Sequence, residues 1–69
     1  MNRIPVDSSN VSEIGYDLNT QTLEVQFKDG NVYQYFDVPP GVHEGLMSAS
    51  SKGQFLNKEI KLNFRYARL

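Results

Sequence analysis

The sequence predicts an α+β domain: a three-stranded antiparallel β-meander followed by two short helices packed on one sheet face. Three features predict this fold class. Apolar residues alternate along the first half, Asp29-Gly30 separates two alternating runs, and Pro39-Pro40 precedes residues with helical spacing. At 69 residues, the chain is long enough for one domain with a small core. Residues 1–8 are polar and aperiodic, so we expect a flexible N-terminal arm there and the domain at residues 9–69.

The first two strands are expected at residues 12–18 and 22–28, where every second side chain is apolar. The alternating apolar residues are Ile14, Tyr16 and Leu18 in the first run and Leu23, Val25 and Phe27 in the second. A short loop of two or four residues around Asn19-Thr20 places both sets on the same side of the hairpin. We expect that side to be the buried face of the sheet.

The second hairpin allows two registers at Asp29-Gly30, and a shift of one residue turns every side chain to the other face. A two-residue type I′ turn places Gln34 on the buried face. A three-residue loop with Gly30 in the left-handed region instead turns Tyr33 and Tyr35 toward the core. We favour the second register because it leaves Gln34 outside the core.

Two helices are expected after the sheet. The pair Pro39-Pro40 ends the third strand, because proline donates no backbone hydrogen bond, and proline suits the first turn of a helix. The spacing of apolar residues then predicts a first helix over residues 41–49. Ser51 and Gln54 match a capping box, which predicts a second helix over about residues 53–61.

Residues 62–69 allow two interpretations. They could continue the second helix, with a stripe formed by Leu56, Ile60, Phe64 and Ala67. They could also form an extended tail in which Leu62, Phe64 and Tyr66 alternate. We favour the extended tail, since Asn63 is a common residue at helix ends.

The charges are divided between the two parts of the chain. Residues 1–49 contain seven acidic and two basic residues, whereas residues 50–69 contain five basic residues and one acidic residue. Such asymmetry is one indication of contact with a polyanion such as RNA. Alternatively, the two parts attract each other, or the bases are only solvated surface residues. The chain has no cysteine, no long apolar run and no signal-like N-terminus, so we expect a cytoplasmic protein that does not contact membranes.

The sequence contains no set of residues suited to catalysis. His43 is the single histidine and cysteine is absent, so one chain cannot supply a two-histidine or thiolate zinc site. No nucleophile, base and orienting group can be named together. We therefore expect a binding module that is not an enzyme and uses neither metal nor cofactor.

Two groups of residues are candidates for binding RNA or another anion. Tyr33 and Tyr35 could stack on unpaired bases if they are exposed. The basic residues that could contact phosphates are Lys52, Lys58, Lys61, Arg65 and Arg68. Ser50, Ser51, Lys52 and Gly53 form a separate candidate anion-binding loop at a helix N-terminus, and helix capping is the alternative role of these residues.

An alternative function is protein interaction through an apolar C-terminal patch. Phe64, Tyr66 and Leu69 are three large apolar residues within the last six positions. A small core leaves little room to bury them, so they could dock on another protein or on a second copy in a homodimer.

Several short motifs occur in a characteristic order, beginning with a Ser-rich start. They are Ile14-Gly15-Tyr16-Asp17, Leu-x-Val-x-Phe before Asp29-Gly30, Tyr33-Gln34-Tyr35, Val38-Pro39, Ser51-x-Gly53, and Phe55-Leu56-Asn57 leading to Ile60-Lys61. Through these motifs the chain resembles the KTSC domain, a module at the C-terminus of some lysyl-tRNA synthetases that also occurs as small free-standing bacterial proteins. The resemblance covers residues 9–69. It implies an association with RNA and brings no catalytic residues.

Overall fold

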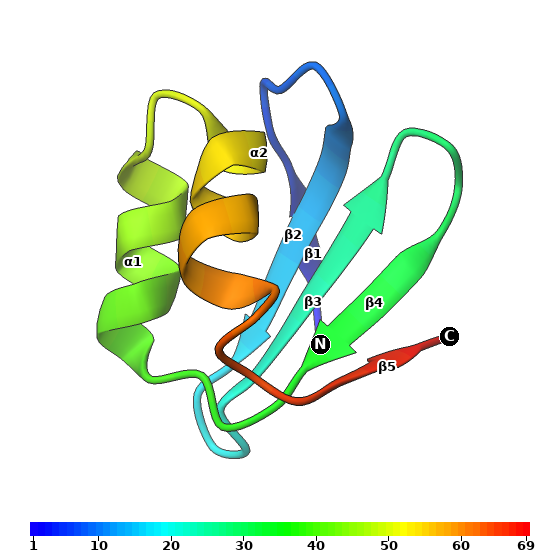
Figure 1. Cartoon of the computed structure of the whole chain (residues 1–69). Helices are drawn as coiled ribbons and strands as arrows, with labels where there is room; N and C mark the ends of the chain where they lie inside the picture. Colours follow the sequence, from blue (N-terminus) through cyan, green and yellow to red (C-terminus); the bar gives the residue numbers. More distant parts are fainter.

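The computed structural model describes residues 1–69 and contains a single antiparallel sheet with consecutive strands as neighbours (Figure 1). The strands are β1 (Arg3–Pro5), β2 (Val11–Asp17), β3 (Thr22–Phe27), β4 (Val32–Tyr35) and β5 (Tyr66–Arg68). The sheet therefore has five strands, and the expected three-stranded meander corresponds to its centre, β2 to β4.

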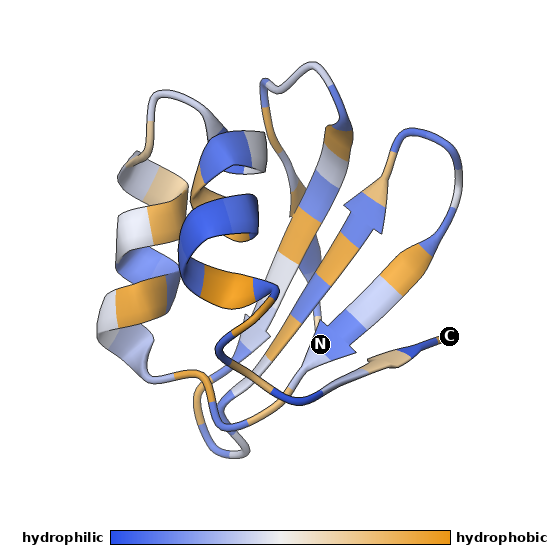
Figure 2. Cartoon of the chain, viewed as in Figure 1, coloured by the Kyte–Doolittle hydropathy of each residue, from blue (hydrophilic) through white to orange (hydrophobic).

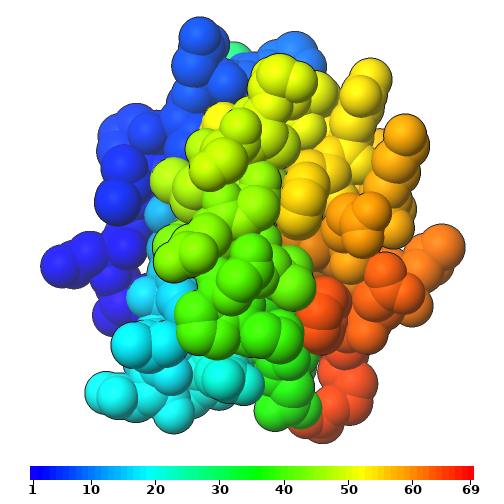
Figure 3. Space-filling model, turned by 90° about the vertical axis from the view of Figure 1, so that its left-hand side faces the viewer, coloured from blue at the N-terminus to red at the C-terminus, as the bar shows by residue number.

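The helices form a second layer on one face of the sheet (Figure 1). They are α1 (Pro40–Ser48) and α2 (Lys52–Phe55), which continues directly into a π-helical turn, η1 (Leu56–Ile60). Seen from outside this layer, α1 lies between the N-terminal segment and the chain that follows α2 (Figure 3). Neither helix has the length and apolar character needed to cross a bilayer.

The core lies between the sheet and the helices. Figure 2 shows apolar residues alternating along the central strands, as expected for a sheet that is covered on one face. The buried side chains of the core are Val11, Ile14, Leu23, Val25, Tyr35, Val38, Leu46, Leu56 and Ile60. No polar or charged side chain is buried with them, so burial of apolar area is the main source of stability.

The first hairpin has the predicted buried face except at Leu18, which follows β2 in the loop and is 63% exposed. Ile14 lies opposite Val25, and Tyr16 lies opposite Leu23. Opposite residues of an antiparallel pair share a face, so these four side chains point toward the helices. The hairpin closes after Asp17 pairs with Thr22, which leaves the four-residue loop that the sequence allowed.

The second hairpin adopts the three-residue loop. The Phe27 amide donates to the Asn31 carbonyl at 2.9 Å, and Gly30 has φ +93°, a conformation that glycine adopts without a Cβ clash. Tyr33 then lies opposite Val25 and Tyr35 opposite Leu23, both on the helix-covered face. The favoured register is therefore confirmed.

Gln34 lies on the opposite, open face, as that register requires. Its side-chain amide donates to the Glu24 carboxylate at 2.9 Å. Arg3 reaches the same region, with its Nε 3.3 Å from Glu13 and 3.5 Å from Glu24. The open face is thus held together by polar contacts, whereas the covered face is held by apolar packing.

Both helices occur close to their predicted positions. The Ser51 hydroxyl accepts a hydrogen bond from the Gln54 amide at 3.3 Å, which confirms the predicted N-cap. The Lys61 amide donates to the Leu56 carbonyl at 2.9 Å, the i to i+5 bond of a π-turn. This turn is a departure from the regular helix expected there, and it buries both Leu56 and Ile60.

The prediction of three strands was wrong because both outer strands were missed. β1 lies within the expected flexible arm and pairs with β2, and the Val6 amide donates to the Ser12 carbonyl at 3.1 Å. β5 lies within the expected extended tail, so the prediction of an extended conformation is confirmed there. The pairing of β5 with β4 was not predicted. Each outer strand has three residues, too few to show a period of two in the sequence.

Candidate functional site

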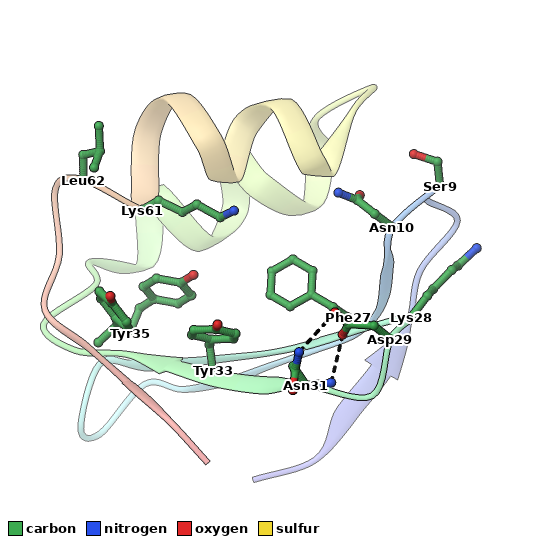
Figure 4. Close-up of a pocket in the computed structure, with 11 residues that line it drawn as sticks. Ser9, Asn10, Phe27, Lys28, Asp29, Asn31, Tyr33, Tyr35, Lys61 and Leu62 are labelled. Atoms are coloured by element: carbon green, nitrogen blue, oxygen red, sulfur yellow. Dashed lines mark hydrogen bonds between the residues drawn. The ribbon is translucent and has the colours of Figure 1, made fainter.

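One concavity is a groove of about 600 Å³ between the end of η1 and the edge of the sheet formed by β3, β4 and β5 (Figure 4). Its floor is aromatic: Phe27, Tyr33, Tyr35 and Tyr66. Lys61 and Leu62 lie on the helical side. Asn10, Asp29 and Asn31 lie at the other end, near the β3–β4 turn. We call this the aromatic groove.

The four rings form one continuous cluster. Tyr33 is at its centre, with ring centroids 5.7 Å from Phe27, 6.4 Å from Tyr35 and 5.9 Å from Tyr66. Tyr35 and Tyr66 are 6.0 Å apart. These spacings lie within the range of favourable aromatic pairs. The cluster extends from the core, where Tyr35 is buried, to the surface, where Tyr66 is 60% exposed.

Register explains how three strands bring these rings together. Phe27 ends β3, and Tyr33 and Tyr35 alternate along β4 on the covered face. Tyr66 lies opposite Tyr35 in the β4–β5 pair, so it shares that face. The helices cover the sheet beside this corner and leave the outer rings partly accessible.

Lys61 closes the groove from above. Its ammonium lies 5.7 Å from the centre of the Phe27 ring, within the distance of a cation–π contact. The ion pairs of the molecule are Arg3 with Glu13, Arg3 with Glu24, and Arg65 with Asp37, so Lys61 has no carboxylate partner. A cation above aromatic rings and without a counterion is suited to an anionic or electron-rich ligand.

Tyr35 supplies a hydroxyl group in its neutral form. Burial, together with the nearby Tyr33 and Tyr66, raises the pKa of Tyr35 above its ordinary value of 10.0. The phenol is therefore protonated at physiological pH. No side chain or backbone group of the protein bonds to the hydroxyls of Tyr33, Tyr35 or Tyr66, so all three remain available.

The turn at the end of the groove contains two hydrogen bonds between Asp29 and Asn31. The Asp29 carboxylate accepts hydrogen bonds from the Asn31 amide at 3.0 Å and from the Asn31 side chain at 3.1 Å. Lys28 and Asn10 lie beside this turn, where the Lys28 amide donates to the Asn10 carbonyl at 2.9 Å. This end offers hydrogen-bonding groups to a ligand that lies on the rings.

The structure gathers some of the residues that the sequence suggested for binding and separates others. Tyr33, Tyr35 and Lys61 meet in the aromatic groove, and Arg68 lies opposite Tyr33 on the same face. Lys58 is exposed on η1 and does not line the groove. Arg65 pairs with Asp37 at 2.8 Å on the surface, outside the groove.

The residues of the expected anion-binding loop all have structural roles except Ser50, which is exposed. The Ser51 hydroxyl caps α2, and the Lys52 ammonium donates to the Ala49 carbonyl at 2.9 Å. Gly53 lies against Asn10, where an added Cβ would be 2.7 Å from the side-chain oxygen. Anion binding at this loop remains a prediction.

The residues of the C-terminal apolar patch, which was expected to dock a partner, differ in burial. Phe64 packs against the core, whereas Tyr66 and Leu69 are exposed. Sequence reasoning missed Phe27 and Lys28 as residues of the groove and assigned Tyr66 to the patch alone. Tyr66 joins the groove because β5 pairs with β4, and this pairing cannot be recognised in the sequence.

Comparisons with known proteins agree on one family. The KTSC domain family matches residues 7–64. A lysine–tRNA ligase of Nostoc punctiforme is 46% identical over 63 residues, which is 91% of this chain and 11% of the ligase. The chain thus spans about a tenth of that relative. An uncharacterised protein of Stutzerimonas stutzeri is 40% identical, and the match covers 100% of this chain and 99% of that protein.

A solved structure has the same fold. The crystal structure of a KTSC domain protein from Yersinia pestis superposes with a TM-score of 0.93 at 43% identity. The superposition covers 99% of this chain and 96% of that one. With the family match over residues 7–64, these similarities establish that the chain belongs to the KTSC domain family.

Proposed function

We propose that the aromatic groove binds an unpaired nucleotide of single-stranded RNA, and that the domain is a weak RNA-binding module. The observation that carries this proposal is the position of the Lys61 ammonium above a cluster of four aromatic rings, with no carboxylate to neutralise it. Aromatic rings stack on bases, and cations contact phosphates, so one groove offers both parts of a nucleotide site.

Stacking is supported by the accessibility of two rings. Tyr66 is 60% exposed and Tyr33 is half-buried, so a base could lie against either ring without unfolding the core. Their rings are tilted by 45° to each other, which offers two surfaces to a flexible strand. Stacking of one base on such a ring contributes about 1–3 kcal/mol.

Phosphate contacts are supported by three basic residues without ion-pair partners. Lys61 and Lys28 line the groove, and Arg68 lies on the same face beside Tyr33. Release of counterions by three contacts gives a slope of log affinity against log salt of roughly −2. On the open face of the sheet, Glu13 and Glu24 share the single cation Arg3, so this cluster keeps a negative charge that disfavours RNA there.

The relatives add support from their context. Lysine–tRNA ligases contain a region 43–46% identical to this chain, and their name identifies tRNA as their substrate. A domain attached to such an enzyme is close to RNA, so weak binding is sufficient for a contribution through high local concentration. The proposal extends this role to the present chain.

The test is an NMR titration of the ¹⁵N-labelled protein with a short single-stranded RNA of mixed sequence, at low and at moderate salt. We expect shift changes at Tyr33, Lys61 and Tyr66 that diminish as salt increases. Leu18 and its neighbours in the β2–β3 loop serve as an internal control, since they do not line the groove. Absence of shifts at about millimolar RNA in low salt, or shifts confined to other surfaces, would contradict the proposal.

A further inference from the structure

The two edges of the sheet differ in their capacity to pair with another strand. On β1, the bond from the Val6 amide to the Ser12 carbonyl fixes which residues face β2. Backbone groups of alternate residues point to opposite sides of a strand, so Arg3 and Pro5 present theirs to the free edge. Proline has no N–H, so this edge lacks one of its donors. Proline on an edge strand is a common protection against pairing.

The β5 edge contains no proline. The Phe36 amide donates to the Arg65 carbonyl at 2.9 Å, and the Leu69 amide donates to the Val32 carbonyl at 2.8 Å. Arg65 and Leu69 therefore face β4, as does Ala67 between them, and the backbone groups of Tyr66 and Arg68 point outward. Two N–H and two C=O groups are thus exposed in a row with the spacing of a strand.

Apolar side chains flank this open edge. Tyr66 is 60% exposed, Leu69 is 68% exposed, and Leu62, which precedes the strand, is 91% exposed. Exposed edge strands with apolar neighbours are sites of pairing with other chains. Arg68 is the one charged residue of β5 that could disfavour pairing with another strand. No bulge interrupts the register of β5 with β4.

We propose that β5 pairs in antiparallel fashion with β5 of a second copy, so that the two sheets join edge to edge in a homodimer. The strand is self-complementary. A two-fold axis at Ala67 places Tyr66 opposite Arg68 of the second copy, and all four outward backbone groups on each chain then find partners. A strand from an unrelated protein has no such built-in register.

The side chains of this pairing are compatible on both faces. On the groove face, each Tyr66 lies opposite a guanidinium, which forms a cross-strand cation–π pair. On the open face, the two Ala67 side chains meet, and they are small enough to permit close approach. Like charges do not face each other at any pair of β5.

Pairing would also extend the aromatic groove. A two-fold axis perpendicular to the sheet keeps both helical layers on the same side, so the two grooves lie on one face. Arg68 of the second copy then lies at the exposed end of each groove, beside Tyr66. The dimer itself does not depend on RNA binding, because its contacts are made by the β5 backbone and side chains.

Sedimentation velocity over a concentration series from about 10 µM to about 1 mM tests the proposal, since so small an interface gives a weak dimer. Arg68→Pro removes the outward N–H and leaves the bonds to β4 intact, and Arg68→Ala removes the same side chain but keeps the N–H. We expect the proline variant to weaken association by about tenfold relative to the alanine variant. Amide spectra of both variants report whether the fold is retained.

A charge exchange at Ala67 gives an independent test that does not alter the groove. In Ala67→Glu, or in Ala67→Lys, two like charges meet at the two-fold axis, so each variant alone should be monomeric. An equimolar mixture of the two should associate again. A wild-type chain that is monomeric at 1 mM overturns the proposal, as does equal association of the Arg68 variants or failure of the mixture to associate.

Discussion

Tyr66 lies directly opposite Tyr35 across the β4–β5 pair, with ring centres 6.0 Å apart. Tyr35 is buried, and Tyr66 is 60% exposed. The last strand therefore completes the covered face and also presents an accessible ring next to the core. This relationship makes the exposed end of the aromatic groove dependent on β5, and it identifies Tyr66 as the residue with which to test stacking.

Substitution of Tyr66 by alanine is expected to reduce RNA affinity about 5- to 160-fold, the range that corresponds to loss of one base–ring stack. Tyr66→Phe keeps the ring and should bind within about twofold of wild type. NMR titration at low protein concentration measures both variants. Wild-type affinity in Tyr66→Ala would exclude stacking on this residue.

Lys61 and Lys58 form a matched pair for the phosphate contact. Both are exposed lysines at the end of the second helix, but only Lys61 lines the groove. Lys61→Ala should reduce the salt slope of RNA binding by about 0.7, which is the value of one phosphate contact. Lys58→Ala should leave the slope unchanged. Equal effects of the two substitutions would indicate general attraction to positive charge.

The centre of the fold could be predicted from the sequence because its polar residues restrict the register. Placing Gln34 outside the core was enough to select the hairpin in which Tyr33 and Tyr35 face the helices. β1 and β5 could not be predicted, since three residues carry too little periodicity and their pairing is decided by neighbouring strands.

The candidate site was predictable only in part, for a related reason. Tyr33, Tyr35 and Lys61 were identified by residue type, and the fold brings them together. Lys52 and Arg65 have the same residue chemistry but engage the Ala49 carbonyl and Asp37. Such contacts join positions whose proximity depends on the tertiary structure, so sequence alone could not separate free from engaged cations.

Two glycines of α1 should respond in opposite ways to alanine. At Gly41 an added Cβ meets no atom within 4 Å, so Gly41→Ala should stabilise the protein by about 0.5 kcal/mol through helix propensity. At Gly45 the Cβ would lie 2.9 Å from the Phe55 ring, which packs against the core. Displacement of that ring costs about 1–3 kcal/mol, more than the gain in propensity.

Urea unfolding of the two variants measures these differences. We expect the midpoint to increase in Gly41→Ala and to decrease in Gly45→Ala, with unchanged slopes. The two substitutions are identical in composition and lie in one helix, so a difference in sign isolates the contact with Phe55. A higher midpoint in Gly45→Ala would show that Phe55 moves aside at little cost.

His43 should make stability depend on pH in the range below neutrality. Its ring stacks on Tyr16 with centroids 4.4 Å apart and planes within 6°. Burial lowers the pKa of His43 below its ordinary value of 6.5, an effect that the nearby Glu44 opposes only in part. The unfolded chain therefore binds a proton more readily than the folded chain. The stability that neutral His43 contributes is complete above pH 6.5, the pKa of this residue in the unfolded chain. This contribution decreases as pH falls from that value to the lower pKa of His43 in the folded chain.

Phenylalanine at position 43 provides the comparison, because it keeps a planar ring against Tyr16 and cannot take up a proton. We expect the free energy of unfolding of the wild-type protein to decrease between about pH 7 and pH 5 by more than that of His43→Phe. Urea unfolding at each pH gives both values, and carboxylates other than Glu44 contribute equally to the two proteins. Parallel curves for the two proteins would show that His43 has the same pKa in the folded and unfolded chains.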